Sequence, residues 1–415
     1  MTDRATEHVT CLGCGCACDD IRVVVTGGGR ITETSNACAL GAAWFGDGAV
    51  PTEIRVNGRA ATLDQGIDKT AALLAGARRP LVYIAGDASC ETQREAVAIG
   101  DRLHAAVDSL AATAAGAVLA GQRRGRATAT LGEIRQQADV IVFWGVDPGE
   151  RYPRFTARYT VGPSTRAKRT VVAVDVGASH GPKDADLRVT IAAADEVDAL
   201  GVMRATVGGH DVDAKKFAPA GELARRLMQA RYAAIVADGE PGVSSTTIDP
   251  DRAEALVALA QALNGPTRCA LSTLRAGGNR SGADAVLTWQ TGFPFAVDFA
   301  EGIPRYRPAA GAHVLLAGGE VDAALVVGAS ATLPRSVADG LNGKPVAVVG
   351  PRASTATFRP VVAIDTGVAG IHEGGTAFRM DDVPLPLRAS LDGPEAAVRV
   401  VRAIRERLGA RGADE

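Results

Sequence analysis

The chain has 415 residues, more than the roughly 250–300 at which a single hydrophobic core stops growing, so two or three domains are expected. Its 47 % hydrophobic and 22 % charged residues are ordinary for a soluble globular protein, and with only 4 % aromatic residues the core must consist largely of Ala, Val, Leu and Ile. The net charge of −2, with scattered basic residues, argues against a nucleic-acid partner, and no stretch approaches the roughly 20 apolar residues of a membrane helix.

The N-terminal segment bears on location and on cysteine chemistry. Residues 1–7 carry charges with no apolar run after them, so no signal peptide is expected and the chain is predicted to be cytoplasmic. Five of the seven cysteines lie within residues 11–38. In the cytoplasm, clustered cysteines more often bind metal than form disulfides.

The cysteine spacing predicts a thiolate metal site. Three close cysteines from one loop and a fourth from a distant turn, in the pattern C-x2-C-x3-C-x19-C, suit a tetrahedral arrangement of sulfurs. The candidate ligands are Cys11, Cys14, Cys18 and Cys38. The pattern favours a [4Fe–4S] iron–sulfur cluster, and structural zinc, a redox pair and a vacated site remain alternatives. Cys16 is a spare thiol in each case.

The elements that follow alternate between strands and helices. Residues 21–26 and 30–34, joined by three glycines, predict a hairpin that carries the cysteine loop. Helices are expected at 64–78 and 91–104, and apolar strands at 80–86, 139–145, 170–175, 232–237, 323–328 and 346–350. Such an alternation indicates an α/β fold with parallel sheets covered by helices on both faces. Several strands end in Gly or Asp at the carboxyl edge, where α/β proteins bind their ligands.

The chain is predicted to have three parts. The first is a small Cys-rich β segment of iron–sulfur type at 1–55. The second is an α/β domain formed by 56–140 and 286–415, and the third is a Rossmann-like α/β domain at 141–285.

Longer motifs point to a particular family. They are F-W-G-V-D-P at 143–148, T-W-Q-T-G-F-P-F-A-V-D-F at 288–299, G-I-P-R-Y at 302–306 and E-G-G-T-A-F-R-M-D at 373–381. Together with the cysteine spacing, and over nearly the whole chain, they resemble the B subunit of formylmethanofuran dehydrogenase. That family falls within the molybdenum/tungsten bis-pterin oxidoreductases, so the resemblance implies a DMSO-reductase-like fold. The aromatic stretch at 288–299 is expected to pack in the core or at an interface.

The resemblance also implies cofactor sites. It assigns the four cysteines to one [4Fe–4S] cluster. It places five further residues where the family binds its pterin cofactor: Gly145, Asp147, Asp175, Arg275 and Asn279.

One departure from the family pattern decides the expected function. The family binds its metal through the cysteine of a D-x5-C-H-G pattern, and here Asp108 and Gly116 are in register while Ala114 and Ala115 replace the cysteine and the histidine. A methyl group cannot coordinate molybdenum or tungsten. The family's D-P-R is D-V-G from Asp175, and its R-G-H-x-N is R-A-G-G-N from Arg275. We therefore expect no metal–pterin cofactor and no catalytic residue on this chain.

Without that metal ligand, the chain most resembles the B subunit of the bacterial formyltransferase/hydrolase complex. That complex serves tetrahydromethanopterin-linked one-carbon metabolism. The resemblance implies three kinds of partner. The formyltransferase (D) subunit moves the formyl group to a methanofuran-type carrier, the amidohydrolase-like (A) subunit releases formate with its own zinc site, and the C subunit lies beside the B subunit. We expect a redox-inactive scaffold.

Two other functions remain open. One is an active formylmethanofuran dehydrogenase whose metal has a non-protein ligand in place of the cysteine. The other is a small-molecule-binding α/β module that uses the former pterin cleft, which a well-formed cleft with convergent polar groups would favour. A zinc hydrolase is not expected, because the six histidines show no metal-binding spacing.

Overall fold

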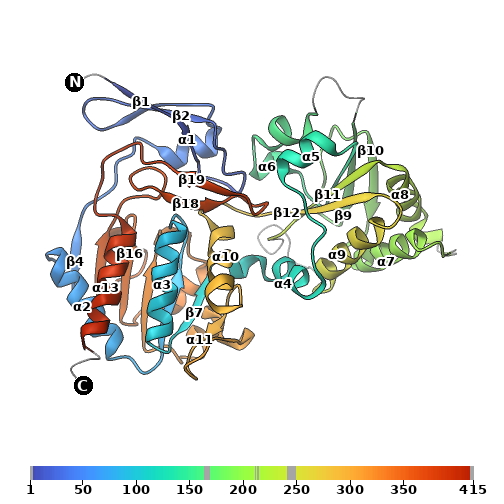
Figure 1. Cartoon of the computed structure of the whole chain (residues 1–415). Coiled ribbons are helices and arrows are strands. Elements are labelled where there is room, and N and C mark those ends of the chain that lie inside the picture. Colours follow the sequence, from blue (N-terminus) through green and yellow to red (C-terminus); the bar gives the residue numbers. More distant parts are fainter. Residues whose placement is uncertain (1–2, 163–168, 211, 213–214, 241–248, 412–415) are drawn as a thin grey trace. The chain divides into compact units, whose positions relative to one another are not determined.

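The computed structural model describes residues 3–162, 169–210, 212, 215–240 and 249–411 (Figure 1). The chain forms two compact units. Unit 1 comprises Met1–Ala112, Gly277–Arg379 and Pro384–Glu415, and unit 2 comprises Thr113–Ala276 and Met380–Val383.

The N-terminal part of unit 1 is a three-stranded antiparallel sheet. Its strands β1 (Arg4–Val9), β2 (Ile21–Val25) and β3 (Ile31–Ser35) pair in that order and are followed by α1 (Ala39–Phe45). Every second residue of β2 is buried, as expected for a strand with one face on a core. The predicted hairpin is confirmed, and β1 adds a third strand to it.

Unit 1 is built on a nine-stranded sheet in the order β14-β13-β7-β6-β15-β16-β17-β4-β5. Its parallel centre consists of β7 (Ala106–Ser109), β6 (Pro80–Ile84), β15 (Ala323–Val327), β16 (Val346–Gly350) and β17 (Val362–Asp365). Antiparallel strands form the two edges: β13 (Val297–Asp298), β14 (Arg305–Tyr306), β4 (Ile54–Val56) and β5 (Arg59–Ala60). A separate antiparallel pair consists of β18 (Gly375–Phe378) and β19 (Pro384–Leu387).

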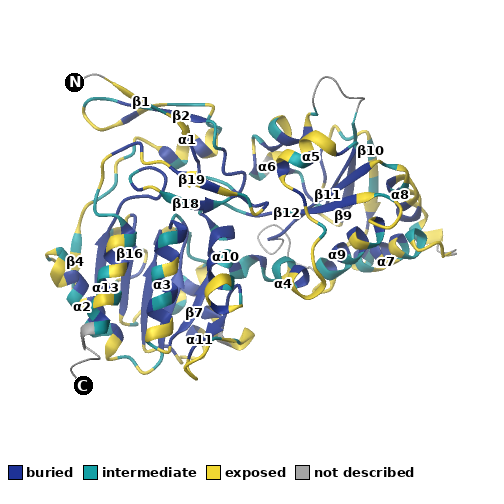
Figure 2. Cartoon of the chain, viewed as in Figure 1, coloured by how far each residue is buried: buried dark blue, intermediate teal, exposed yellow. Residues whose placement is uncertain are grey.

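Helices cover both faces of the nine-stranded sheet. One face packs against α2 (Leu63–Ala75), α3 (Cys90–Arg102), α10 (Arg280–Thr291) and α13 (Ala397–Arg411), and the other against α11 (Ala312–Ala317) and α12 (Arg335–Leu341). Figure 2 shows dark blue strands beneath helices α2, α3 and α13, whose outer faces are yellow. Helix α2 begins with a capping box between Thr62 and Gln65 and ends before Gly76, which agrees with the helix predicted at 64–78.

Unit 2 contains a five-stranded parallel sheet in the order β10-β9-β8-β11-β12. The strands are β8 (Val140–Trp144), β9 (Thr170–Val176), β10 (Leu187–Ile191), β11 (Tyr232–Asp238) and β12 (Arg268–Leu274). The helices are α4 (Ala115–Arg124), α5 (Leu131–Gln137), α6 (Pro148–Arg151), α7 (Glu196–Val207), α8 (Ala218–Gln229) and α9 (Arg252–Leu263). The α/β class with parallel sheets is thus confirmed. Among the described residues, no helix combines the length and the apolar character that a bilayer crossing requires.

The boundaries of the two compact units differ from the domain boundaries predicted from the sequence. Residues 113–140 belong to unit 2, because α4 packs on α9, and residues 277–285 belong to unit 1, because α10 packs on α3. The three-part division of the chain stays a prediction.

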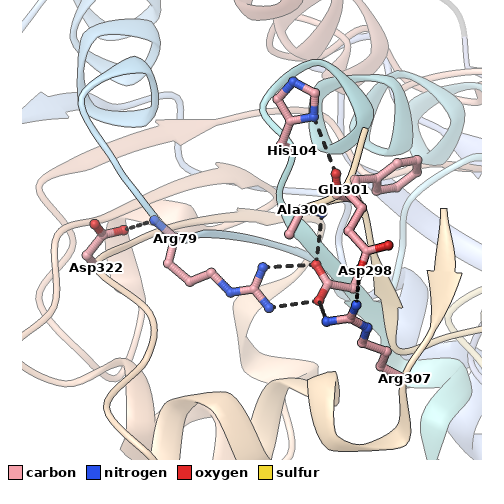
Figure 3. A network of polar contacts seen from close by, with 8 residues as sticks. Arg79, His104, Asp298, Ala300, Glu301, Arg307 and Asp322 are labelled. Carbon is pink, nitrogen blue, oxygen red and sulfur yellow. Dashed lines mark hydrogen bonds and ion pairs between the residues drawn. The ribbon is translucent and has the colours of Figure 1, made fainter. Parts of the chain in front are cut away.

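The buried carboxylate of Asp298, on β13, forms an ion pair with Arg79, which precedes β6 in unit 1 (Figure 3). Asp298 is 2 % exposed, and both of its oxygens accept hydrogen bonds of 2.9 Å from the guanidinium of Arg79. Arg307 and the Ala300 N–H, at 3.3 and 3.1 Å, complete its partners. Burial raises the pKa of Asp298, but Arg79, the Ala300 N–H and Arg307 outweigh burial and lower the pKa below its usual value.

The substitution Arg79→Leu should destabilise the protein by about 3 kcal/mol, because it leaves a buried carboxylate without its main partner. Arg335→Leu is the matched control: Arg335 is 94 % exposed and pairs with Asp339 on one helix surface, so its loss should cost less than about 0.5 kcal/mol. Denaturant unfolding measures both. Because the pKa of folded Asp298 is depressed, this stabilisation is complete above the unfolded pKa of about 3.9 and is lost as the pH falls through the folded value. Equal effects of the two substitutions would contradict the assignment.

Candidate functional site

The cysteine loop in unit 1 is a tight turn closed by its own backbone. The Cys11 N–H donates to the Cys18 carbonyl at 2.9 Å, and the Ala17 N–H donates to the Cys14 carbonyl at 3.1 Å. Cys11 and Cys18 are buried, whereas Cys14 is half-buried. The loop therefore holds three of the four candidate ligands close together.

The fourth candidate, Cys38, reaches the same place through α1. Cys38 is the N-cap residue of this helix, and Gly41 lies in the first turn. A Cβ on Gly41 would lie 3.2 Å from the Cys11 sulfur and 3.9 Å from the Cys38 sulfur, so the missing side chain makes room for both thiols. The Gly13 N–H donates to the Cys11 sulfur at 3.4 Å.

The thiols also influence one another's ionisation. Burial raises the pKa of Cys11 most, the Gly13 N–H lowers it, and Cys14, Cys18 and Cys38 raise it further. The pKa of Cys14 is lowered to about 7, chiefly by a hydrogen bond from the Cys16 side chain and against the effect of burial. The five cysteines of the segment are thus electrostatic neighbours.

The cysteines lie near one another, but their side chains are not arranged around a common point as metal ligands would be. In the described part of the chain, no group of three or more His, Cys, Asp or Glu side chains is arranged to hold a metal ion. The features that suit a metal cluster are soft thiolate donors, the gap at Gly41 and a backbone N–H directed at a sulfur. The assignment of the four ligands stays a prediction.

Two glycines hold the cysteine loop against the rest of unit 1. A Cβ on Gly277 would lie 2.1 Å from the Leu12 carbonyl oxygen and 2.7 Å from the Cys14 nitrogen, so only glycine permits this approach. The Gly278 N–H donates to the Leu12 carbonyl at 2.9 Å, and the Gly278 carbonyl accepts the Asp87 N–H at 3.0 Å. This role was not predicted from the sequence, although the adjacent glycines within R-A-G-G-N were a visible signal.

The residue predicted to stand in place of the family's metal ligand is buried. Ala114, in unit 2, ends the 3₁₀ helix η1 (Leu110–Ala114) and is 1 % exposed. Asp108, at the start of the same pattern, lies in unit 1 and accepts the backbone N–H groups of Ser109, Ala296 and Ala312 at 2.8, 3.2 and 2.7 Å. Burial raises the pKa of Asp108 against these three donors.

Three predicted pterin-contact residues lie where β8 and β9 of unit 2 end. Gly145 has φ +59°, which favours glycine, and Asp147 accepts the Gly149 N–H at 2.8 Å as the N-cap residue of α6. Asp175 is 7 % exposed and accepts hydrogen bonds of 2.6 and 2.7 Å from Arg188. Burial raises the pKa of Asp175, but the Gly181 N–H and Arg188 lower it overall.

The other two predicted contacts are also held by protein groups. Arg275 follows β12 in unit 2, is 4 % exposed and lies 3.9 Å from Glu240. Asn279, in unit 1, has φ +60° and donates from its amide to the Ala88 carbonyl at 2.8 Å, while its amide oxygen accepts the Phe378 N–H at 2.8 Å. Each of the five residues therefore has a structural role, and their cofactor role stays a prediction.

Unit 1 has a cavity of about 240 Å³ at the carboxyl edge of its sheet. The edge changes direction between β6 and β15, because the strands that follow β6 and β15 add on opposite sides. Such switch points are where α/β sheets bind ligands. Polar lining residues include Asp87, Ser330, Thr332, Arg352, Thr357 and His372.

The chain resembles known proteins in both sequence and structure. The chain is 31 % identical over 420 residues to the B subunit of the tungsten-containing formylmethanofuran dehydrogenase 2 of Methanocaldococcus jannaschii, a match that covers 95 % of this chain and 96 % of that protein. It is 30 % identical over 374 residues to the B subunit of the formyltransferase/hydrolase complex Fhc of Methylorubrum extorquens, a match that covers 86 % of this chain and 98 % of that protein.

The structural comparison agrees with the sequence comparison. A chain in the crystal structure of the FhcABCD complex of Methylorubrum extorquens with methylofuran matches at a TM-score of 0.73 and 28 % identity, over 87 % of this chain and 99 % of that chain. No protein-family model matches the chain. Because the sequence matches reach 30 % identity over nearly the whole of each relative, the chain belongs to the family of formylmethanofuran dehydrogenase B subunits, which includes the B subunit of Fhc.

Proposed function

We propose that the chain is the B subunit of a formyltransferase/hydrolase complex of the Fhc type and acts there as a redox-inactive scaffold. The observation that carries this proposal is the match to the B subunit of Fhc over nearly the whole of that protein, in sequence and in structure. Ala114 supports it, because a buried methyl group stands where the family pattern has its metal-ligand cysteine.

The proposed complex converts formyl-tetrahydromethanopterin to formate through a methanofuran-type carrier. The formyltransferase (D) subunit transfers the formyl group, the amidohydrolase-like (A) subunit hydrolyses the carrier-bound formyl group, and the C subunit lies with the B subunit. The related Fhc structure is a complex with methylofuran, which supports the carrier class. The chain also matches the B subunit of a tungsten-containing dehydrogenase, but that alternative is not favoured, because Ala114 stands where the family pattern has its ligand cysteine.

The finer fold assignment is also a proposal. A DMSO-reductase-like architecture is supported by two separate α/β units and a small cysteine-bearing β-sheet at the N-terminus. We further propose that Cys11, Cys14, Cys18 and Cys38 bind a [4Fe–4S] cluster that stabilises this segment, and that no molybdenum or tungsten pterin is bound. A three-stranded sheet with one short helix buries too little apolar surface to be stable alone.

The cavity at the β6–β15 switch point favours a second candidate function. Its volume of about 240 Å³, with serine, threonine and arginine side chains among mostly apolar lining residues, suits a small molecule that carries polar groups. Such a molecule would bind within unit 1 and would not require a metal.

Metal analysis of the intact complex, purified without oxygen, tests the first proposal. We expect about four iron atoms per chain, as one cubane cluster requires, with neither molybdenum nor tungsten. Stoichiometric molybdenum or tungsten would overturn the scaffold assignment and restore the dehydrogenase. Mass spectrometry of small molecules released from the same denatured sample tests the cavity, and release of none would remove the second candidate.

The substitutions Cys11→Ser and Cys38→Ser should each remove the iron and expose residues 9–40 to protease, because the segment then lacks its stabilising cluster. Cys16→Ser is the matched control, since Cys16 lies in the same loop but outside the ligand pattern. Iron content and limited proteolysis measure the outcome. If Cys11→Ser keeps its iron, the ligand assignment fails, whatever the fate of the scaffold proposal.

A scaffold needs a surface that its partners cover, and Trp289 marks a candidate. Its side chain is 62 % exposed and packs edge-on against Phe378, with ring centroids 5.5 Å apart. Exposed tryptophans are enriched among residues that anchor protein interfaces.

The substitution Trp289→Ala should weaken assembly of the complex by about 2 kcal/mol, which corresponds to roughly thirtyfold in affinity. Val314→Ala, at a residue that is 38 % exposed on α11, is the control and should assemble normally. Co-purification and sedimentation of the tagged chain measure both. Normal assembly of the Trp289 variant would show that this side chain lies outside the interfaces.

A further inference from the structure

Asp87 is linked through its backbone to the cysteine loop of unit 1. It lies between β6 and α3 and has φ +59°, in the left-handed region that favours Gly, Asn and Asp. The Asp87 N–H donates to the Gly278 carbonyl at 3.0 Å, and the Gly278 N–H donates to the Leu12 carbonyl at 2.9 Å. These two backbone hydrogen bonds join Asp87 to the loop that carries three of the four candidate ligands.

The side chain of Asp87 is linked to α1, the element that carries the fourth candidate. Its Oδ1 accepts the Trp44 Nε1–H at 3.1 Å. Trp44 lies on α1, and the N-cap residue of this helix is Cys38. The rest of the Trp44 side chain packs against a buried apolar cluster that consists of Leu12, Ala369, Ala377 and Leu387. Because Nε1–H is the sole hydrogen-bond donor of an indole, Asp87 is the polar anchor of this side chain.

The loop and α1 also pack directly on each other. A Cβ on Gly13 would lie 3.1 Å from the Leu40 carbonyl oxygen and 3.2 Å from the Trp44 Cβ, so the loop lies close against the helix. Packing of this kind limits how near α1 can come, but apolar contact is not directional. A hydrogen bond fixes direction as well as distance. The bond from Trp44 to Asp87 therefore sets the orientation of α1 on unit 1.

We propose that Asp87 is a positioning residue for the thiol site. Its N–H holds the loop through Gly278, and its carboxylate holds α1 through Trp44. One residue thus sets the spacing between Cys38 and the loop thiols. The inference rests on the proposed binding of a cluster by these thiols. Because a cubane cluster uses four thiolates, an α1 that turns away from the loop should make the cluster lose iron faster.

Two substitutions separate the carboxylate of Asp87 from its backbone conformation. Asp87→Gly keeps the left-handed backbone and removes the acceptor for Trp44. Asp87→Asn tolerates the same backbone and keeps an oxygen acceptor. Burial raises the pKa of Asp87 most, while the Trp44 N–H and Arg280 lower it. Since burial disfavours the charged form, we expect the uncharged amide of Asp87→Asn to be tolerated at this position.

The rate at which a ferrous-iron chelator removes iron from the intact complex, purified without oxygen, tests this role. Loss of the visible absorption of the cluster follows the reaction. Asp87→Gly should lose iron about tenfold faster than the native chain, as expected for one hydrogen bond to a charged group. Asp87→Asn should stay within about twofold of the native rate, because it keeps the acceptor.

Trp44→Phe removes the donor of the same hydrogen bond and should also lose iron about tenfold faster. It tests the bond independently if Asp87→Gly does not assemble. The double variant Trp44→Phe/Asp87→Gly should be no faster than about tenfold, because both changes remove one interaction, whereas independent effects would multiply to about a hundredfold.

Asn57→Gly is the matched control. Asn57 is exposed, has φ +52° and lies in the turn between β4 and β5, so its variant should lose iron at the native rate. Equal rates for the native chain and Asp87→Gly would overturn the inference, as would an Asp87→Asn variant as fast as Asp87→Gly. A native complex without iron would overturn the cluster proposal and this inference with it, whereas stoichiometric molybdenum or tungsten would overturn the scaffold function alone.

Discussion

The close approach of Gly277 to the backbone of Leu12 and Cys14 is the contact on which the N-terminal part of unit 1 depends. With a Cβ distance of 2.1 Å to the Leu12 oxygen, any side chain at Gly277 would push the cysteine loop away. The neighbouring Gly278 bonds the Leu12 carbonyl on one side and the Asp87 N–H on the other. The backbone of the cysteine loop therefore packs directly on the backbone of residues 277–278. This contact supports the N-terminal three-stranded sheet, whose own core is small.

The C-terminal part of unit 1 completes this attachment. His372 and Leu391 hold the turn at 46–48, and the Thr10 hydroxyl donates to the Pro386 carbonyl at 2.8 Å. The cysteine segment is thus fastened at its loop by residues 277–278 and at its exit by the segments around β18 and β19. Segments separated by hundreds of residues in the sequence meet there. A bound cluster would hold the segment together internally, and these contacts hold it to the sheet.

The sequence predicted those features that local pattern controls. Apolar runs and helix caps located strands such as β6 and helices such as α2, and cysteine spacing singled out four thiols that the fold brings near one another. Strand order was beyond reach, because pairing of β6 with β15 joins residues more than 200 positions apart. The sequence also did not predict the ion pair of Arg79 with Asp298 or the hydrogen bond between the His372 ring and the Gly48 carbonyl. The reason is the same, because their partners are distant in sequence and meet only in the folded chain. The aromatic stretch at 288–299 was expected to pack in the core or at an interface: Phe295 and Phe299 are buried, and the interface role of the exposed Trp289 stays a prediction.

Two positions of the family's D-x5-C-H-G pattern differ in what they contribute to the fold of this chain. Asp108 accepts three backbone N–H groups, from β7, from the segment before β13 and from the start of α11, so its removal would leave buried donors without acceptors. Ala114 ends a short 3₁₀ helix and is 1 % exposed, with no polar side-chain atom that needs a hydrogen bond. In the family pattern the cysteine at this position is the metal ligand. If the complex binds no such metal, as proposed, alanine at position 114 leaves the three hydrogen bonds of Asp108 intact, which agrees with the proposed scaffold role.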